Sequence, residues 1–189
     1  MSKGVEFLMK KNKIEVIYGS AKVKAAQKLE LTAADGTVRE LTATHIILAT
    51  GSRSKELPNL KQDGKKIIGY REAMTLPNQP KSMVIVGSGA IGVEFAYFYK
   101  SVGTDVTIVE FMPNIVPRED QEISKELERV FRKKGIKIMT NAAVEKVESN
   151  GSTSKVHVKT SNGMEVLDAE MVLSAAGVTP NTENLGLEA

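Results

Sequence analysis

Residues 82–96 read SMVIVGSGAIGVEFA, and this stretch decides the fold of the chain. An apolar strand, residues 82–86, runs into a Gly-x-Gly-x-x-Gly turn and then into an apolar helix. In a dinucleotide site, Gly87 allows the tight turn out of the strand, Gly89 lets the backbone approach a pyrophosphate, and Gly92 lets the helix lie close to the sheet. The N–H groups at the start of the helix then face the phosphate charge. The order of strand, turn and helix predicts a nucleotide site.

A carboxylate follows the turn at the spacing expected for a ribose contact. Glu110 ends the next strand-like run, residues 106–109, about 20 residues after the turn, where a carboxylate can accept hydrogen bonds from the adenosine ribose. The same charge repels a ribose 2′-phosphate, and the first arginine beyond it is Arg118. The pattern therefore favours NAD over NADP. A solvated strand end is the alternative for Glu110, but it leaves the spacing unexplained.

The composition excludes several classes of function. The 189 residues are 41% apolar and 26% charged, as in an ordinary globular protein. A net charge of +3 is too small to indicate nucleic acid, no apolar run approaches a membrane span, and the first residues lack a signal-peptide core. We therefore expect a cytoplasmic protein without nucleic-acid or membrane partners. Without cysteine the chain has no Cys-bound metal, and we expect no metal site of another kind. His45 and His157 are expected on strand faces rather than as catalytic bases.

The elements predicted before the turn are mostly strands. Residues 2–11 carry an apolar face and are predicted to end a helix. Residues 53–80 hold three prolines and are predicted to form a linker with a short central element. Asp35-Gly36 is a tight-turn signal. Strands are predicted at residues 13–18, 21–24, 28–33, 37–42 and 45–49.

After the turn a helix is predicted between a proline-marked loop and Gly135, and strands follow. Its apolar stripe consists of Ile123, Leu127, Val130 and Phe131. The strands are predicted at residues 136–139, 143–148, 155–160, 165–167 and 171–175. The predicted fold class is α/β, with a Rossmann-like domain of parallel sheet, helices and a β-meander.

An internal repeat relates the start of the chain to its second half. Residues 7–12 and 131–135 each end a helix before a strand, and residues 35–51 and 162–177 each run from a turn to an apolar strand that ends at glycine. The copies lie about 120 to 130 residues apart. Only the second copy follows a glycine turn, so the first is predicted to be the back half of a nucleotide-binding domain cut upstream of Met1. An independent small β domain is the alternative.

With these motifs in order, the chain resembles the pyridine nucleotide–disulfide oxidoreductases, flavoproteins with paired FAD and NAD(P) domains, and is most like the members that oxidise dihydrolipoamide. The resemblance covers the whole chain and rests on GVEFL (4–8), ATGS (49–52), GSGAIGVE (87–94), VEF (109–111) and GVTPN (177–181). In that family the redox cysteine pair precedes this region and a catalytic histidine and glutamate follow it. The resemblance therefore implies a central fragment without catalytic residues.

The resemblance also implies sites for both dinucleotides. Val144 and Gly177 match positions beside the adenine and the nicotinamide, and Glu94 matches a carboxylate near the nicotinamide–flavin junction. An exposed residue that complements the helix dipole is the alternative for Glu94. The expected NAD residues are Gly87, Ser88, Gly89, Ala90, Ile91, Gly92, Val93, Glu94, Glu110, Val144 and Gly177. The expected FAD residues are Gly19, at a backbone contact to the adenosine, and Thr50, Gly51 and Ser52, in the turn near the flavin nucleotide.

The expected domains are the second half of an FAD-type domain (1–52), the linker (53–80), the NAD-binding domain (81–178) and the start of a return to the FAD domain (179–189). Val178 departs from the family, which commonly has an arginine after the glycine of the last motif. This departure bears on the subfamily more than on the family.

The function implied for the parent enzyme is hydride transfer between NAD and FAD, coupled to a dithiol, in a homodimer that belongs to a 2-oxo acid dehydrogenase complex. The cofactors carry the chemistry, and the protein supplies position and electrostatics. One alternative is another flavin reductase of this architecture, such as an NADH oxidase or a glutathione, mercuric or ferredoxin reductase. The other is a stand-alone module that binds NAD without turnover.

Overall fold

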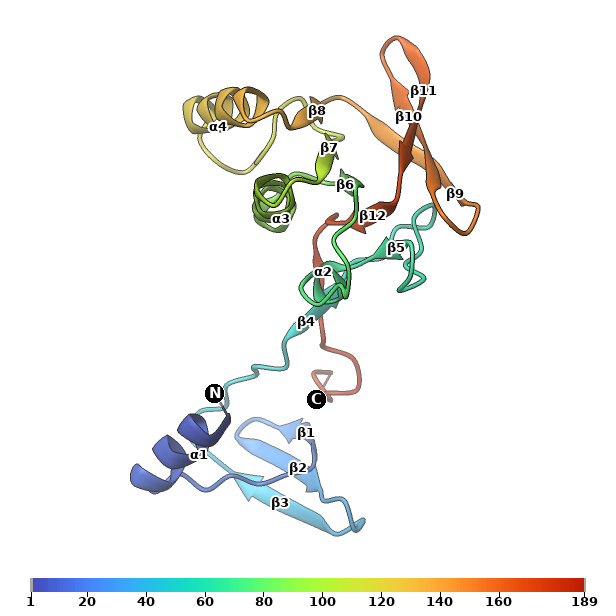
Figure 1. Ribbon diagram of the computed structural model, residues 1–189. Helices are drawn as coiled ribbons and strands as arrows, with labels where there is room; N and C mark the ends of the chain where they lie inside the picture. The colour runs from blue at the N-terminus through green and yellow to red at the C-terminus, as the bar shows by residue number, and fades with distance from the viewer. Residues whose placement is uncertain (1, 189) are drawn as a thin grey trace. The chain divides into compact units, whose positions relative to one another are not determined.

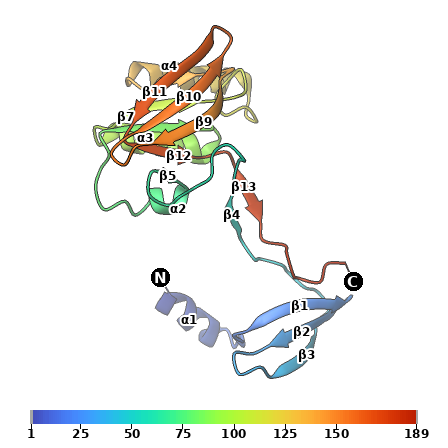
Figure 2. The ribbon, with the colours of Figure 1, turned by 90° about the vertical axis from the view of Figure 1, so that its right-hand side faces the viewer.

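The computed structural model describes residues 2–188, and the chain divides into two compact units, Met1–Gly51 with Pro180–Ala189 and Ser52–Thr179 (Figures 1 and 2). The first unit contains one helix and an antiparallel sheet in the order β1-β2-β3. Its elements are α1 (Ser2–Lys11), β1 (Ser20–Ala25), β2 (Lys28–Thr32) and β3 (Val38–Thr42). The predicted turn forms between β2 and β3, where the Thr37 N–H donates to Asp35 Oδ1 at 2.9 Å and Gly36 has a φ of +84°.

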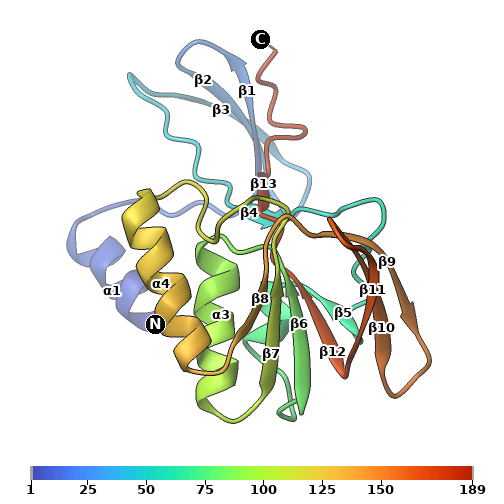
Figure 3. The same cartoon turned by 90° about the horizontal axis from the view of Figure 1, so that it is seen from above.

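A parallel sheet in the order β5-β12-β6-β7-β8 is the centre of the second unit. Figure 3 shows helices α3 and α4 on one face of this sheet and the antiparallel sheet β9-β10-β11 on the other. The elements are β5 (Ile67–Ile68), α2 (Tyr70–Ala73), β6 (Ser82–Val86), α3 (Ala90–Ser101), β7 (Asp105–Val109), α4 (Gln121–Lys133), β8 (Lys137–Met139), β9 (Ala143–Ser149), β10 (Ser154–Thr160), β11 (Gly163–Ala169) and β12 (Met171–Ser174). The short strands β4 (Ser52–Ser54) and β13 (Val178–Pro180) pair with each other. The predicted α/β fold with a β-meander is confirmed.

Strand β6 shows why the strand before the glycine turn is continuously apolar. Met83 and Ile85 lie in the core that includes residues of α3 and α4, whereas Val84 and Val86 lie in the core that includes residues of the meander. Side chains alternate between the faces of a strand, so a strand that is covered on both faces needs an apolar residue at every position. The two covering layers therefore fix which residues of β6 face each core, and with them the position of the turn that follows.

Helix α4 begins and ends as the sequence predicts, but its apolar stripe is shorter. The Asp120 side chain caps the helix by accepting from the Glu122 and Ile123 N–H groups, and Gly135 adopts a φ of +79° just beyond its end. Phe131 is buried, whereas Ile123 is 63% exposed. Ile123 therefore lies outside the buried part of the predicted stripe. In this turn Ser124 is buried instead, because its hydroxyl donates to the carbonyl of the loop residue Ile115.

Two strands predicted in the first unit are not strands in the structure. Residues 13–18 and 45–49 are irregular and pair with no described strand. Their counterparts in the repeat, β8 and β12, pair with β7 and β6. A strand needs a neighbour for its backbone hydrogen bonds, and residues 2–51 provide none for these segments. Val16 and Ile47 are accordingly 53% and 89% exposed.

Of the two histidines predicted on strand faces, one lies on a strand and the other does not. His45 lies in the irregular segment 45–49 and is exposed, so its expected place on a strand face is wrong. His157 lies in β10 as predicted and approaches Glu148 Oε2 at 3.2 Å. Hydrogen bonds from Lys146 and His157 lower the pKa of the Glu148 carboxyl. This group is a charged cluster on the meander surface.

The predicted linker, residues 53–80, packs against the second unit instead of connecting two domains freely. Leu60 is fully buried in the core that includes the meander, and the Asn59 amide donates to the Val144 carbonyl. Strand β5 extends the parallel sheet, and the Tyr99 hydroxyl donates to the Ala73 carbonyl of α2 at 2.5 Å. The linker prediction is therefore corrected. Its prolines separate short elements that belong to the second unit.

Replacing Leu60 with alanine tests this packing. We expect Leu60→Ala to lower the free energy of unfolding by about 2–5 kcal/mol, the usual cost of a large cavity in a packed core. Denaturant unfolding measures the loss. The neighbouring Lys61→Ala is the control, because Lys61 is exposed and its change is expected to stay within about 0.5 kcal/mol. Equal effects of the two variants would contradict burial of this segment.

Candidate nucleotide-binding site

The glycine turn joins β6 to α3 at the carboxyl edge of the parallel sheet. Gly87 has a φ of +102°, a conformation that side chains rarely adopt, and its N–H donates to the Val109 carbonyl at 2.9 Å. Gly89 is the N-cap of α3, and the first bond of the helix runs from the Val93 N–H to the Gly89 carbonyl at 3.1 Å. The N–H groups of the first turn have no carbonyl partner inside the helix and form a natural anion site.

The three glycines of the turn differ in what surrounds them. A Cβ on Gly92 would lie 2.1 Å from the Gly87 carbonyl oxygen, and one on Gly87 would lie 2.5 Å from the Ala175 carbonyl oxygen. A Cβ on Gly89 would meet no heavy atom within 4 Å. Close packing of the protein therefore explains Gly87 and Gly92. The packing of the protein leaves Gly89 unexplained, and the space beside it is open to a ligand.

Glu110 lies at the end of β7 and is 7% exposed. Its Oε2 accepts from the Ser88 N–H at 2.8 Å and from the Ser88 hydroxyl at 2.5 Å. Its Oε1 accepts from the Met112 N–H at 2.8 Å. The structure thus brings the predicted acid against the predicted turn, a contact across 22 residues of sequence that the strand pairing of β6 with β7 makes possible.

Two further predicted residues lie on segments that meet the same edge. The Ala175 N–H donates to the Val86 carbonyl at 2.8 Å, so Gly177 follows β12 close to the turn. The Ala142 N–H donates to the Glu110 carbonyl at 2.9 Å, which places the start of β9, with Val144, beside the end of β7. The carboxyl ends of neighbouring parallel strands are where ligands bind in open α/β sheets.

Glu94 is the fifth residue of α3 and is exposed. The remaining residues of the predicted set, Ala90, Ile91 and Val93, form the start of that helix, with Ala90 exposed and Val93 buried. The exposure of Glu94 agrees with both of its interpretations, as a carboxylate near the reacting rings and as a solvated residue near a helix N-terminus.

Two of the residues predicted for FAD, Thr50 and Gly51, are hydrogen-bonded to Asn181 within the first unit. The Thr50 hydroxyl donates to the Asn181 carbonyl at 2.6 Å, and the Asn181 N–H donates to the Gly51 carbonyl at 3.0 Å. These bonds join two motifs that the sequence placed 131 residues apart. The packing of the first unit itself explains why residue 19 is glycine, because a Cβ there would lie 2.5 Å from the Thr32 carbonyl oxygen. Ser52 begins β4.

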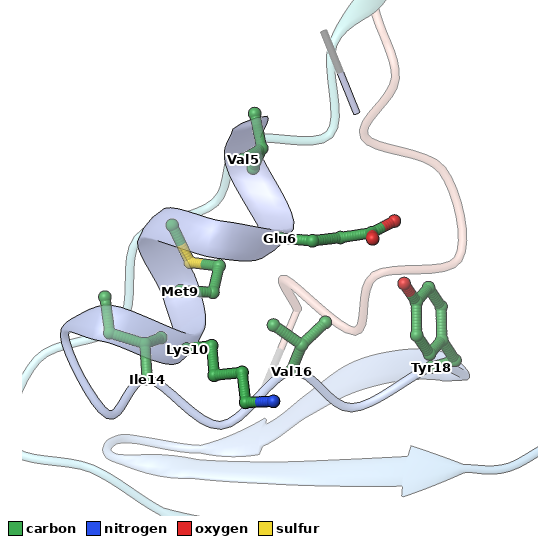
Figure 4. Close-up of a pocket in the computed structure, with 7 residues that line it drawn as sticks. All are labelled: Val5, Glu6, Met9, Lys10, Ile14, Val16 and Tyr18. Carbon is green, nitrogen blue, oxygen red and sulfur yellow. The ribbon is translucent and has the colours of Figure 1, made fainter. Parts of the chain in front are cut away.

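An apolar groove lies between α1 and the segment that follows it (Figure 4). Its volume is about 320 Å³. Helix α1 has no buried residue, so its apolar face is open to this groove. None of the residues predicted for NAD or FAD lines it. The lining residues are Val5, Glu6, Met9, Lys10, Ile14, Val16 and Tyr18.

Among residues 2–188, no three His, Asp or Glu side chains gather closely enough to hold a metal ion. None of the helices in this range has the length and apolar character that crossing a bilayer requires.

Sequence reasoning missed the contacts that hold the site together. The sequence did not predict three donors that hold the turn and Glu110 in place: the Ser88 hydroxyl, the Met112 N–H and the Val116 N–H. The Val116 N–H donates to the Ser88 carbonyl at 3.0 Å. A polar residue at the free position of the glycine turn was the only available signal, and the pattern itself leaves that position unassigned.

Comparisons with known proteins agree with this geometry. The family model described as pyridine nucleotide-disulphide oxidoreductase matches residues 1–189. The chain is 45% identical to a dihydrolipoyl dehydrogenase of Rhizobium etli, over 100% of this chain and 42% of the relative. Among solved structures, LpdA of Mycobacterium tuberculosis has a TM-score of 0.83 at 28% identity, over 99% of this chain and 42% of that chain. The HOCl-induced flavoprotein disulfide reductase RclA of Escherichia coli has a TM-score of 0.74 at 28% identity, over 99% and 43%.

The chain therefore belongs to the pyridine nucleotide-disulphide oxidoreductase family. It spans about two fifths of the length of the relatives that it matches.

Proposed function

We propose that this chain is the NAD-binding portion of a flavoprotein disulfide reductase of the dihydrolipoyl dehydrogenase type. The observation that carries the proposal is the open face of Gly89 beside the start of α3, with Glu110 bonded to the same turn. Relatives named dihydrolipoyl dehydrogenase at 45%, 45% and 43% identity favour dihydrolipoamide as the substrate of the whole enzyme.

The residues of the turn fit a dinucleotide. The N–H groups at the start of α3 would bind the pyrophosphate, and the lack of a side chain at Gly89 would let it approach. Glu110 would accept from the adenosine ribose, Val144 would lie beside the adenine, and Gly177 would lie toward the nicotinamide. Gly87 and Gly92 would hold the turn in shape. When bound, NAD and FAD supply the hydride and electron chemistry, and the residues of this chain bind and orient them.

The first unit would be completed by further strands of an FAD-type domain. Residues 13–18 and 45–49 carry exposed apolar side chains and have no partner strand among the described residues, although their counterparts β8 and β12 are paired strands. The groove beside α1 is apolar for the same reason. The FAD roles of Gly19, Thr50, Gly51 and Ser52 depend on this completion. A homodimeric parent enzyme, membership of a 2-oxo acid dehydrogenase complex and a cytoplasmic location stay predictions.

The chain alone is expected to bind NADH without oxidising it. The reason is that the nucleotide turn is complete, whereas a chain without cysteine offers no dithiol for electron exchange. The measurement is lipoamide-dependent NADH oxidation, alongside titration calorimetry with NADH. Turnover by purified chain that is free of full-length enzyme would contradict the assignment of this chain as a binding portion, and absence of binding would contradict the nucleotide site.

A further inference from the structure

Ser88 occupies the free position of the glycine turn, and its side chain is fully buried. The pattern needs glycine at positions 87, 89 and 92 and makes no demand on position 88. In the structure the Ser88 hydroxyl donates to Glu110 Oε2 at 2.5 Å, and the Ser88 N–H donates to the same oxygen at 2.8 Å. The hydroxyl therefore has a defined acceptor, and that acceptor is the acid at the end of β7.

These contacts leave the two oxygens of Glu110 unequal. A carboxylate offers about four lone-pair sites, two on each oxygen. Ser88 fills both sites on Oε2, and the Met112 N–H fills one on Oε1 at 2.8 Å. Oε1 is thus the oxygen that keeps room for another donor.

We infer that Ser88 is a positioning residue for nucleotide choice, because its hydroxyl holds the Glu110 carboxylate with Oε1 toward the adenosine ribose. The inference rests on the proposed function, in which Glu110 is the ribose acid. Without the hydroxyl, Oε2 keeps a single donor, and the terminal torsion of a glutamate has broad preferences that do little to fix the carboxylate plane. The acceptor and the negative charge are then held beside the ribose 2′ position less firmly, by the Ser88 and Met112 N–H groups alone.

The first test compares Ser88→Ala with Ser124→Ala by titration calorimetry with NADH and NADPH. We expect Ser88→Ala to weaken NADH binding by roughly fivefold to tenfold and to lower the NADH-over-NADPH preference by a similar factor. Ser124 is the matched control. It is an equally buried serine whose hydroxyl donates to the Ile115 carbonyl and not to Glu110, so its loss is expected to leave the preference unchanged. Equal weakening of NADH and NADPH by Ser88→Ala would overturn the inference.

Ser88→Cys separates the loss of the hydrogen bond from the loss of side-chain volume in Ser88→Ala. The thiol fills the position but is a weak donor, so it is expected to reproduce the change in preference caused by alanine. A cysteine variant with the wild-type NADH-over-NADPH preference would show that volume and not the hydrogen bond matters, and would overturn the inference.

The second test adds Ser88→Ala to Glu110→Ala. If Ser88 acts through Glu110, the added change leaves both affinities where Glu110→Ala alone has put them. An effect of Ser88→Ala that is as large in this background as in the wild type would overturn the inference while leaving the nucleotide site intact. Failure of the proposed function has a different signature, because the wild-type chain then shows no saturable NADH binding, and this result would overturn both.

Discussion

Gly89→Val is expected to abolish NADH binding while the chain stays folded. The valine side chain would occupy the space beside the start of α3, where no protein atom lies within 4 Å of a Cβ, so the protein accommodates it but a pyrophosphate does not. Loss of two hydrogen bonds to a charged group, at about 1.5 kcal/mol each, predicts a decrease in affinity on the order of a hundredfold or more. Titration calorimetry measures the affinity.

The control for this result is a measurement that the Gly89→Val protein is still folded. Gly89 has a φ of −66°, which any residue adopts, so we expect a cost of at most about 1 kcal/mol from the poorer N-cap. Gly92→Ala is the opposite case, because its Cβ would lie 2.1 Å from the Gly87 carbonyl oxygen and should destabilise the turn itself. Gly4→Val also meets no atom within 4 Å and should leave NADH binding unchanged. A folded Gly89→Val protein with wild-type affinity would show that this turn is not the site.

Glu110→Ala is expected to weaken NADH binding about tenfold to a hundredfold, since hydrogen bonds to a charged acceptor contribute roughly 1.5–3 kcal/mol. The same change should improve NADPH binding, because it removes a negative charge that would face the 2′-phosphate. Glu110 also accepts from Ser88 and Met112, so its removal disturbs the turn as well. The ratio of the two affinities is therefore the diagnostic quantity, because a disturbed turn weakens both nucleotides alike.

Two companion variants refine this measurement. Glu110→Gln keeps the size of the side chain and removes only its charge, so it should shift the ratio in the same direction with less disturbance of the turn. Phe111→Arg, at a position that is 74% exposed, should add NADPH affinity to Glu110→Ala by offering the 2′-phosphate a bidentate partner. If Glu110→Ala lowers both affinities by the same factor, or changes neither, Glu110 is not the ribose acid and the assignment of NAD loses its main support.

The parts of the fold that depend on local pattern were predictable from the sequence. Strand β6, the glycine turn and α3 follow from apolar runs and glycine spacing, and the meander β9-β10-β11 follows from apolar runs separated by the turn signals Asn150-Gly151 and Asn162-Gly163. The strand prediction at residues 45–49 failed because a strand also needs a neighbour, and no local signal reports whether one is present. Leu60 was assigned to a linker because prolines surround it, although tertiary packing buries its side chain completely.

The candidate site was predictable to the level of its elements but not of its hydrogen bonds. The spacing of Glu110 from the turn places the two on neighbouring strands, and the structure brings them into contact. The partners of the carboxylate could not be predicted, because they depend on side-chain direction and on the path of the loop after β7. The Met112 N–H donates to Oε1 from two residues further along that loop.

Amide chemical-shift mapping of the labelled chain during an NADH titration tests most directly whether NADH binds at the start of α3. We expect saturable shifts at Gly89, Ala90 and Ile91, where the first-turn N–H groups would meet the pyrophosphate, and at Met112, whose N–H donates to Glu110. Saturable shifts that cluster elsewhere in the chain, or no shifts at these four amides when NADH is in large excess, would contradict binding at the start of α3.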